Sequence, residues 1–273
     1  MPNFTILLAP AEGKTDGGNP FAPDMFDYRT SNTFNYFHDL NLDRRKVIDT
    51  LQATIRNSEE EALSKLFGIQ GDYLDEAIKA NMKIYQAPLM SALERYSPGV
   101  MYKAMDFAGL PTGAQRRLLE NGLILSGMFG LLRPDDLIPN YRLKMDASLP
   151  EFGRVGKFWR ERHSELLNQT LEGRVVWNLL PGAQQAAWED ARTYQMMITV
   201  RFEHVTNEGR KTISHGVKTL RGQLVNLIVR ESLEDPEMLH EWTHPAGYVL
   251  DVEASSWDES RLHHDLVMVK EVA

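Results

Sequence analysis

Hydrophobic residues recur along the chain with two different spacings, which predict both helices and strands. Val47, Leu51 and Ile55 lie four residues apart, so they share one face of an amphipathic helix. The mostly apolar run Phe4–Ala9 predicts a short strand, followed by a glycine- and proline-rich loop, Gly13–Pro23. The two spacings together indicate that helices and strands share one core.

Further elements follow from the same spacings and from capping and turn signals. Predicted helices are one that begins at Asp43, one between a Ser58–Glu61 capping box and Gly68, and those over 72–82, 88–95, 112–121, 155–171 and 217–232. Predicted strands cover 175–178, 247–253 and 266–270, with a hairpin of 196–204 and 211–215 that turns at Asn207-Glu208-Gly209. No long linker or repeat separates these elements. We therefore expect one compact domain, residues 1–273, of the mixed α/β (α+β) class, with a mixed sheet and surrounding helices.

Composition narrows the class of protein. Of the 273 residues 42% are apolar, which is enough for one large core. There is no cysteine, which excludes disulfide frameworks, thiolate metal sites and thiol-based peroxide chemistry. No apolar stretch approaches the roughly 20 residues that span a bilayer, and no N-terminal signal is present. We expect a soluble cytoplasmic protein with no membrane contact.

Charge is distributed unevenly along the chain. The net charge of −8 argues against a general nucleic-acid binder, which is usually basic. Residues 191–230, however, hold seven Lys/Arg against two Glu, whereas residues 231–273 hold two basic groups against eleven acidic ones. A local basic surface can therefore exist inside an acidic protein. The alternative is that these runs are only solvated faces.

The segment 125–145, LSGMFGLLRPDDLIPNYRLKM, carries the most specific chemistry. Gly127 and Gly130 permit backbone conformations and close approaches that a Cβ would forbid. Backbone amides in such a turn, beside Arg133, form a candidate cradle for phosphate or another anion. The alternative is a strand, a turn and a loop that only pack.

The same segment ends in an alternating stretch. Arg142 and Lys144 project from one face of an extended chain, and Tyr141 and Leu143 from the other. Phe129 and Tyr141 are candidates for stacking on unpaired bases if the ligand is single-stranded or distorted DNA.

Six blocks along the chain carry a recognisable pattern: LLAPAEGKT at 7–15, SGMFGLLRP at 126–134, YRLKM at 141–145, KFWRERHSELLN at 157–168, VKTLRGQLVNLIVRE at 217–231 and GYVLDVEASS at 247–256. In this pattern the chain resembles the YaaA family, bacterial proteins associated with peroxide stress. The resemblance implies a helix-hairpin-helix-like element beside a positively charged cleft that binds DNA. It also implies protection against hydrogen peroxide by limiting iron-driven damage. The turn Asn178–Gln184 departs from the family, which usually carries a serine and often a tyrosine there, and this implies an altered ligand contact.

Two motifs are rejected on their context. HEWTH at 240–244 matches the zinc-protease spacing, but Pro245 pushes His244 out of the helical region, so the helix ends before the second ligand. EGKT at 12–15 resembles the end of a P-loop, but Leu8 stands where the first glycine is required, and residues 16–20 are a poor start for the helix that the motif needs. Lys14 remains a candidate anion contact at the end of a strand. We expect no metal site and no cofactor.

Four charged residues complete the candidate site. Lys218 and Arg221 share one face near the start of a helix, where the dipole favours an anion. Asp251 and Glu253 face one side of a late strand. These carboxylates either pair with Arg142, Lys218 or Arg221, or they serve as acid–base groups.

Two functions compete. The first is a non-enzymatic stress protein that binds DNA by sequence-independent phosphate contacts. Its candidate contacts are Lys14, Gly127, Gly130, Arg133, Arg142, Lys144, Lys218 and Arg221. The second is an enzyme on a small anionic substrate, such as a nucleotide or a carboxylated metabolite. In the enzyme, Lys14, Arg142, Lys218 and Arg221 hold the anion, and the acid–base group is one of Glu12, Asp251 and Glu253.

Overall fold

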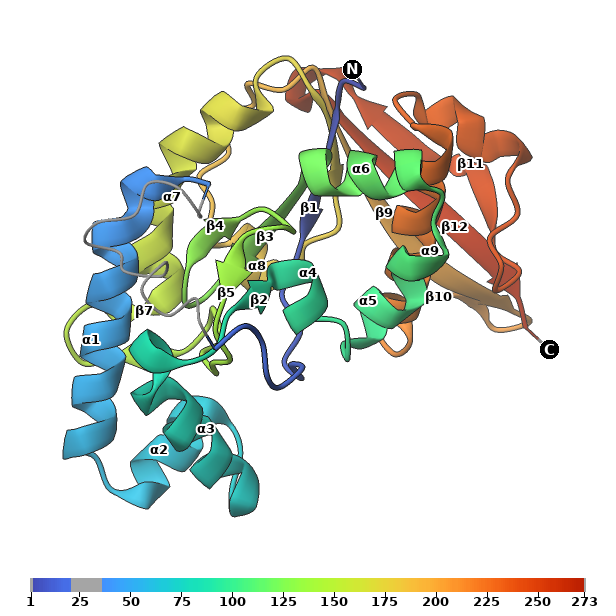
Figure 1. The fold of residues 1–273 in the computed structure, drawn as a ribbon. Helices are drawn as coiled ribbons and strands as arrows, with labels where there is room; N and C mark the ends of the chain where they lie inside the picture. Colours follow the sequence, from blue (N-terminus) through green and yellow to red (C-terminus); the bar gives the residue numbers. More distant parts are fainter. Residues whose placement is uncertain (1, 21–35, 273) are drawn as a thin grey trace.

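A single mixed sheet of eight strands joins the two halves of the chain, as seen in the computed structural model, which describes residues 2–20 and 36–272 (Figure 1). The strand order is β11-β12-β9-β8-β1-β3-β4, and β10 pairs with β9. The strands are β1 Phe4–Leu8, β3 Gly122–Ser126, β4 Gly130–Leu132, β8 Val175–Asn178, β9 Met196–Thr206, β10 Gly209–Thr212, β11 Val249–Asp258 and β12 His263–Glu271. Two small two-stranded sheets lie outside this sheet among the described residues: β2 Met90–Ser91 with β5 Leu137–Ile138, and β6 Ser148–Leu149 with β7 Gly153–Arg154.

The middle of the sheet is parallel and buried. β1 runs parallel to β3 on one side and to β8 on the other, and β8, β9 and β12 are parallel in turn. Every residue of β1, β3 and β8 is buried. Parallel strands are covered on both faces, so they consist of continuous apolar runs rather than alternating ones. The run at the N-terminus is such a strand.

Helices cover the sheet on both sides (Figure 1). Their bounds are α1 Asn41–Asn57, α2 Glu60–Phe67, α3 Asp72–Met82, α4 Ala92–Arg95, α5 Val100–Met105, α6 Thr112–Asn121, α7 Val155–Leu171, α8 Gly182–Gln185 and α9 Val217–Glu231. Short 3-10 turns are η2 His38–Leu40, η3 Ile84–Gln86, η4 Phe107–Gly109, η5 Pro236–Glu241 and η6 Glu259–Arg261. α5, α6 and α9 pack together in front of the sheet, and α1 and α7 lie on its other flank. Arg162 of α7 donates to Asp43 of α1 at 2.9 Å and ties these two helices together.

The predicted mixed α/β fold is confirmed, with local corrections. The Ser58–Glu61 capping box is wrong, because Glu59 occupies the N-cap of α2 and no side chain caps it. The predicted helix over 88–95 starts only at Ala92, since Met90 and Ser91 pair with β5. α5 was not predicted. The last three residues of the predicted loop, 21–23, lie outside the described residues.

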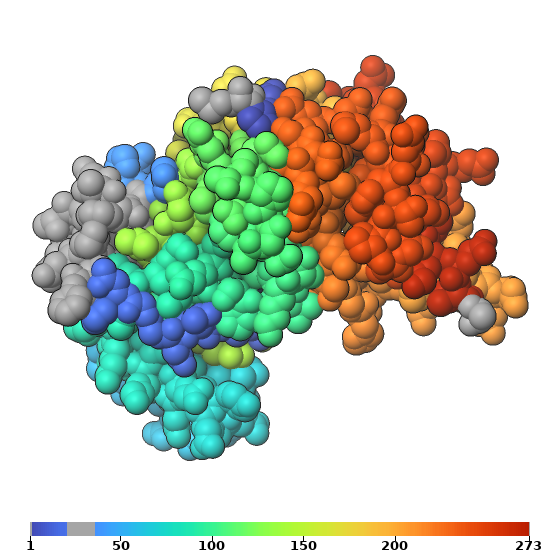
Figure 2. Space-filling model, turned by 45° about the vertical axis from the view of Figure 1, so that its right-hand side comes forward, coloured from blue at the N-terminus to red at the C-terminus, as the bar shows by residue number. Residues whose placement is uncertain are grey.

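Gly222 allows α9 to approach α5 closely, and Figure 2 shows the surfaces of these segments in direct contact. A Cβ at Gly222 would lie 2.8 Å from the Cβ of Ala104 and still closer to the carbonyl oxygen of Met101. We expect Gly222→Ala to lower the free energy of unfolding by about 1–3 kcal/mol, because the two helices would be forced apart. Urea denaturation measures this change.

Gly113 in α6 provides the matched control. The nearest atom to a Cβ at Gly113 would be Nη1 of Arg117, at 3.6 Å, which is an ordinary contact. Gly113→Ala is expected to raise stability by roughly 0.5–1 kcal/mol, because alanine loses less backbone entropy in a helix. Equal effects of the two substitutions would contradict the close packing of α9 on α5.

Candidate functional site

The carboxyl edge of the parallel strands is the natural place for a ligand in this fold. β1 has a parallel neighbour on either side, and the chain leaves all three strands at the same edge. Loops that depart in different directions from such an edge leave a crevice between them. The segment after β1, residues 9–14, borders this crevice.

A hollow of about 280 Å³ at this edge, here called the anion cleft, gathers charged residues from distant parts of the chain. Its polar lining includes Glu12 and Lys14 after β1, Arg142 and Lys144 from the extended segment, Gln184 from α8 and Lys218 from α9. Four basic side chains thus meet two carboxylates, those of Glu12 and Asp146, which leaves an excess of positive charge in a protein whose net charge is −8. The arrangement is suited to an anion.

Arg142 and Lys144 are held in place from behind. Tyr141 and Leu143 are buried, so the alternation predicted from the sequence is confirmed. Asn81 of α3 is fully buried and fixes the backbone of Arg142, donating to its oxygen at 2.8 Å and accepting from its nitrogen at 2.9 Å. On the cleft side, Glu12 lies 3.4 Å from Arg142 Nη2 and 3.5 Å from Lys144 Nζ. Within the protein, the Glu12 carboxylate is therefore the anion that pairs with Arg142 and Lys144.

Lys14 has an unusual environment. Its nitrogen lies 3.1 Å from the Ala11 oxygen, 3.3 Å from the Glu12 oxygen and 4.2 Å from the centre of the Tyr141 ring. Burial, and after it the nearby Arg142 charge, lowers the pKa of Lys14 to about 7, and the Glu12 carboxylate offsets this only in part. Lys14 therefore changes charge near neutral pH.

Arg221 borders a second compartment that adjoins the anion cleft. This compartment, of about 360 Å³, is lined by Arg221, Lys218 and the mostly apolar segment 98–102, which includes the start of α5. The two hollows share residues 9–12, Pro181 and Lys218, so they lie side by side. Lys218 and Arg221 lie three residues apart on α9, as expected, and both point to these hollows.

The comparisons with known proteins identify the family of the chain. The model of the family described as "Peroxide stress protein YaaA" matches residues 4–254. The chain belongs to the YaaA family. A UPF0246 protein of Streptomyces coelicolor is 31% identical over 96% of this chain and 99% of its own length. An uncharacterized protein of Campylobacter jejuni is 28% identical over 86% of the chain and 88% of its own. A UPF0246 protein of Corynebacterium glutamicum is 32% identical over 84% and 86%, respectively.

The glycine turn of this YaaA family member lies in the packed interior and does not line the anion cleft. The amides of Met128 and Phe129 both donate to Ser126 Oγ at 3.2 Å. A Cβ at Gly127 would lie 2.8 Å from the Lys144 backbone, and one at Gly130 would lie 2.7 Å from the Trp159 ring. The turn therefore supports the segment that bears Arg142 and Lys144 from behind, and it is not the exposed amide cradle expected from the sequence.

Arg133 lies away from the cleft. β4 is antiparallel to β3, so the chain has turned back from the carboxyl edge when it reaches Arg133. The guanidinium donates to the Leu119 oxygen at 2.9 Å and lies 4.2 Å from the Tyr36 ring centre. Its role in the YaaA fold is packing at the opposite end of β3.

Asp251 and Glu253 are not brought to the site. β11 is four strand spacings from β1, about 19 Å away. Asp251 pairs with Arg210 of β10 and not with the three expected cleft cations. The regular register with β12 breaks after Asp251, so Glu253 lies in a bulge and the two carboxylates do not form a regular strand face. Of the three proposed acid–base groups, only Glu12 reaches the cleft.

The expected stacking platform is also buried. Phe129 and Tyr141 pack edge to face with ring centres 4.9 Å apart. The Tyr141 hydroxyl is bonded to Tyr96 at 2.6 Å and to Ser126 at 2.8 Å. Neither ring is available to an unpaired base.

The HEWTH segment has a structural role in this family member. η5 ends at Glu241, before the second histidine, as Pro245 predicts. His244 is 1% exposed, and both ring nitrogens face backbone partners, the Leu220 oxygen and the Ala246 amide.

Within residues 2–20 and 36–272 no cluster of three His, Asp or Glu side chains is placed to hold a metal ion. Over the same ranges, no helix is long and apolar enough to cross a membrane.

Gln184 was not predicted as a contact. It lies in the turn that departs from the family pattern, is 9% exposed and lines the anion cleft. Its side-chain oxygen has no hydrogen-bond partner among the described residues. The departure from the family pattern was the only sequence signal that pointed to this turn.

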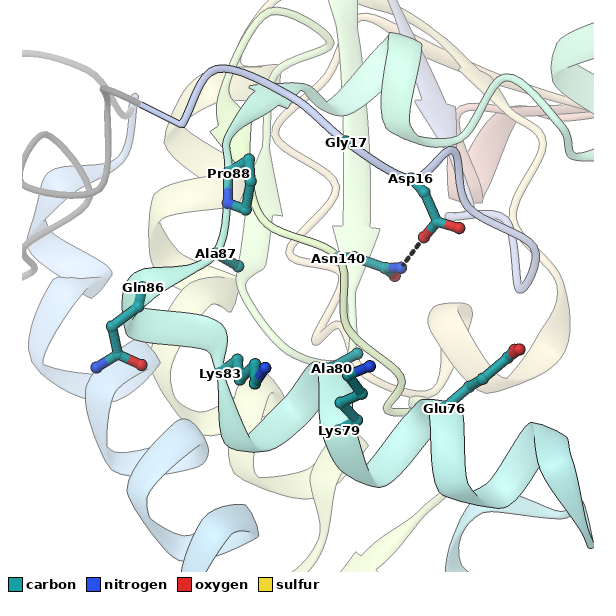
Figure 3. A pocket seen from close by; sticks show the side chains of 10 residues that line it. All are labelled: Asp16, Gly17, Glu76, Lys79, Ala80, Lys83, Gln86, Ala87, Pro88 and Asn140. Carbon is teal, nitrogen blue, oxygen red and sulfur yellow. Dashed lines mark hydrogen bonds between the residues drawn. The ribbon is translucent and has the colours of Figure 1, made fainter.

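A wider hollow of about 740 Å³ lies between α3 and the loop that carries Asp16 (Figure 3). Lys79 and Lys83 of α3 border it, but so do the carboxylates of Asp16 and Glu76. Asp16 also accepts from Asn140 at 2.8 Å. Two cations and two carboxylates leave no net charge there, so the anion cleft remains the better candidate site.

Proposed function

We propose that the protein binds DNA through sequence-independent phosphate contacts in the anion cleft. The observation that supports this proposal is the convergence of Lys14, Arg142, Lys144 and Lys218, with Arg221 adjoining, from three distant segments. Arginine and lysine contact phosphate oxygens without reading base edges. A cytoplasmic role in peroxide stress completes the proposal and derives from the family.

The helix pair α2–α3 lies beside the cleft and would be the helix-hairpin-helix-like element of the proposal. Lys144 Nζ is 3.4 Å from the position that a Cβ would take at Gly68, in the turn between these helices. The first turn of α3, however, carries Asp72 and Asp75, which oppose a phosphate at that helix end. The proposal therefore relies on the cations of the cleft and not on the turn.

The direct test is fluorescence anisotropy with short single-stranded, duplex and bulged DNA between about 50 and 200 mM salt. Three or four phosphate contacts predict a slope of log affinity against log salt of roughly −3 to −4 for duplex DNA. No binding at low salt to any of the three forms would refute the proposal.

A second candidate, an enzyme on a small anionic substrate, is favoured by one observation. Lys14 is an amine that is largely uncharged just above neutral pH, beside cations that can hold a substrate anion. Such amines serve as bases or nucleophiles. The acid–base role would fall to Lys14 or Glu12. Turnover of a nucleotide or a keto acid that is lost in Lys14→Met would favour the enzyme over a DNA-binding protein.

The charge of Lys14 gives binding a predictable pH dependence. Its pKa of about 7 means that the ammonium forms below pH 7 and is lost above it. We expect affinity for DNA to fall by about tenfold from about pH 6 to about pH 8.5 at constant ionic strength, since one charged contact disappears. Anisotropy titrations across this range measure the effect, and phosphodiesters do not titrate there.

Lys14→Met separates this effect from other titrations. In this variant the affinity should be low and nearly independent of pH over the same range. A pH step of undiminished size in Lys14→Met would assign the titration to another group.

A further inference from the structure

The apolar compartment beside the anion cleft differs in chemistry from the cleft itself. Its wall is the end of the loop between α4 and α5 and the first turn of α5, where Met101 and Tyr102 are mostly buried and Val100 is 52% exposed. Leu179 and Pro181 face it from the turn after β8. The Tyr102 hydroxyl donates to the Ala9 oxygen at 2.9 Å, so the ring is fixed in the wall. A fixed, mostly apolar wall suits a flat heteroaromatic group.

Two polar groups at this composite site have no partner among residues 2–20 and 36–272. Arg221 is half-buried, and none of the described residues forms a hydrogen bond or ion pair with its guanidinium. Burial lowers the pKa of Arg221, and no carboxylate offsets that cost. Gln184 presents an unpaired, buried amide oxygen to the neighbouring cleft. An alkyl chain would satisfy neither group, whereas the carbonyls, ring nitrogens and amino groups of a base can bond to both.

The two compartments together match the two ends of a nucleotide. One end of the site is cationic and takes a phosphate between Arg142, Lys144 and Lys218, and the other is apolar with a single guanidinium. Lys218 borders both hollows, so a phosphate and the base attached to it through a sugar can occupy them at once.

We infer that the site binds one nucleotide, with its base unstacked in the apolar compartment and its phosphate in the anion cleft. This inference rests on the phosphate binding proposed above and adds the recognition of the base. The nucleotide is either part of a DNA strand, at an unpaired position, or free. In a strand, the base leaves the helix stack when it enters the compartment.

The test uses duplex DNA with 2-aminopurine at an unpaired position. Binding by the wild-type protein should raise 2-aminopurine fluorescence several-fold, and the bulged duplex should bind on the order of tenfold tighter than the paired one. Val100→Trp should fill the mouth of the compartment and remove both effects. It should leave the affinity for paired DNA and its salt dependence nearly unchanged, because Arg142, Lys144 and Lys218 still contact phosphate in the anion cleft. Leu42→Trp, at a 77% exposed position of α1, is the matched control and should behave as the wild type.

A parallel titration compares free dAMP with deoxyribose 5-phosphate. If the protein binds no DNA, the proposed function fails, but tighter binding of dAMP that Val100→Trp abolishes would still support the base compartment for a free nucleotide. If DNA binds with no rise in 2-aminopurine fluorescence, and dAMP binds no better than the sugar phosphate, the base compartment is refuted while phosphate binding stands.

Discussion

Replacing both Arg142 and Arg221 by glutamate is expected to abolish DNA binding and leave the protein folded. The change converts two cations of the adjoining hollows into two anions. The Arg142 guanidinium lies 3.4 Å from the Glu12 carboxylate, so a glutamate at position 142 would repel Glu12. Each lost charged contact costs roughly 1.5–3 kcal/mol, so the affinity should fall at least about a hundredfold. Anisotropy at low salt measures the affinity, and circular dichroism checks the fold.

Arg56→Glu with Arg116→Glu is the control for total charge. Both arginines are exposed, at the end of α1 and on α6, and the pair changes the net charge by the same amount. Only a small loss of affinity is expected from this pair. Comparable losses in the two double variants would mean that total charge, and not the cleft, governs binding.

Arg95→Leu is expected to have the largest effect on stability. Arg95 is 0% exposed, and its guanidinium donates to four backbone oxygens, those of Thr15, Gly17, Pro88 and Ile138. Leucine would leave these oxygens without their partner. We expect a loss of about 3–5 kcal/mol, or a drop in Tm of roughly 10 °C. Thermal and urea unfolding measure it.

The same substitution should weaken the anion cleft. Two of the four oxygens belong to the segment directly after Lys14, which Arg95 ties to the body of the protein. Lower DNA affinity should therefore accompany lower stability, even at temperatures where the variant is folded. Arg116→Leu, which removes an exposed arginine paired with Glu120, should change stability by less than about 0.5 kcal/mol. A similarly small change in Arg95→Leu would contradict the role assigned to its hydrogen bonds.

Elements with a clear spacing were predictable from the sequence. α1, α3, α7 and α9 follow apolar residues at helical spacing, and β1 and β8 follow short apolar runs. The alternation of Arg142 and Lys144 with buried neighbours was also predictable, because an extended chain has a period of two. α5 was missed because six residues carry too little of the helical pattern.

Contacts between distant segments were not predictable in the same way. The sequence shows that Gly127 tolerates a close neighbour, but not that the neighbour is the backbone of Lys144. It shows two carboxylates on a late strand, but not that β11 lies at the far edge of the sheet. The order of strands in a sheet depends on the whole set of strand pairings, so it cannot be predicted from the sequence of a single segment. The expected carboxylates and the glycine turn therefore lie elsewhere, whereas the cations of the cleft meet.

The parallel pairing of β1 also determines when the site can form during synthesis. Both edges of β1 can be paired only after β3, which starts at Gly122, and β8, which starts at Val175, have been synthesised. α9, which carries Lys218 and Arg221, follows later still. Pairings between segments so far apart in sequence form slowly, and large domains pass through intermediates. A nascent chain therefore has no anion cleft until most of it has left the ribosome, and truncated products should lack ligand binding altogether.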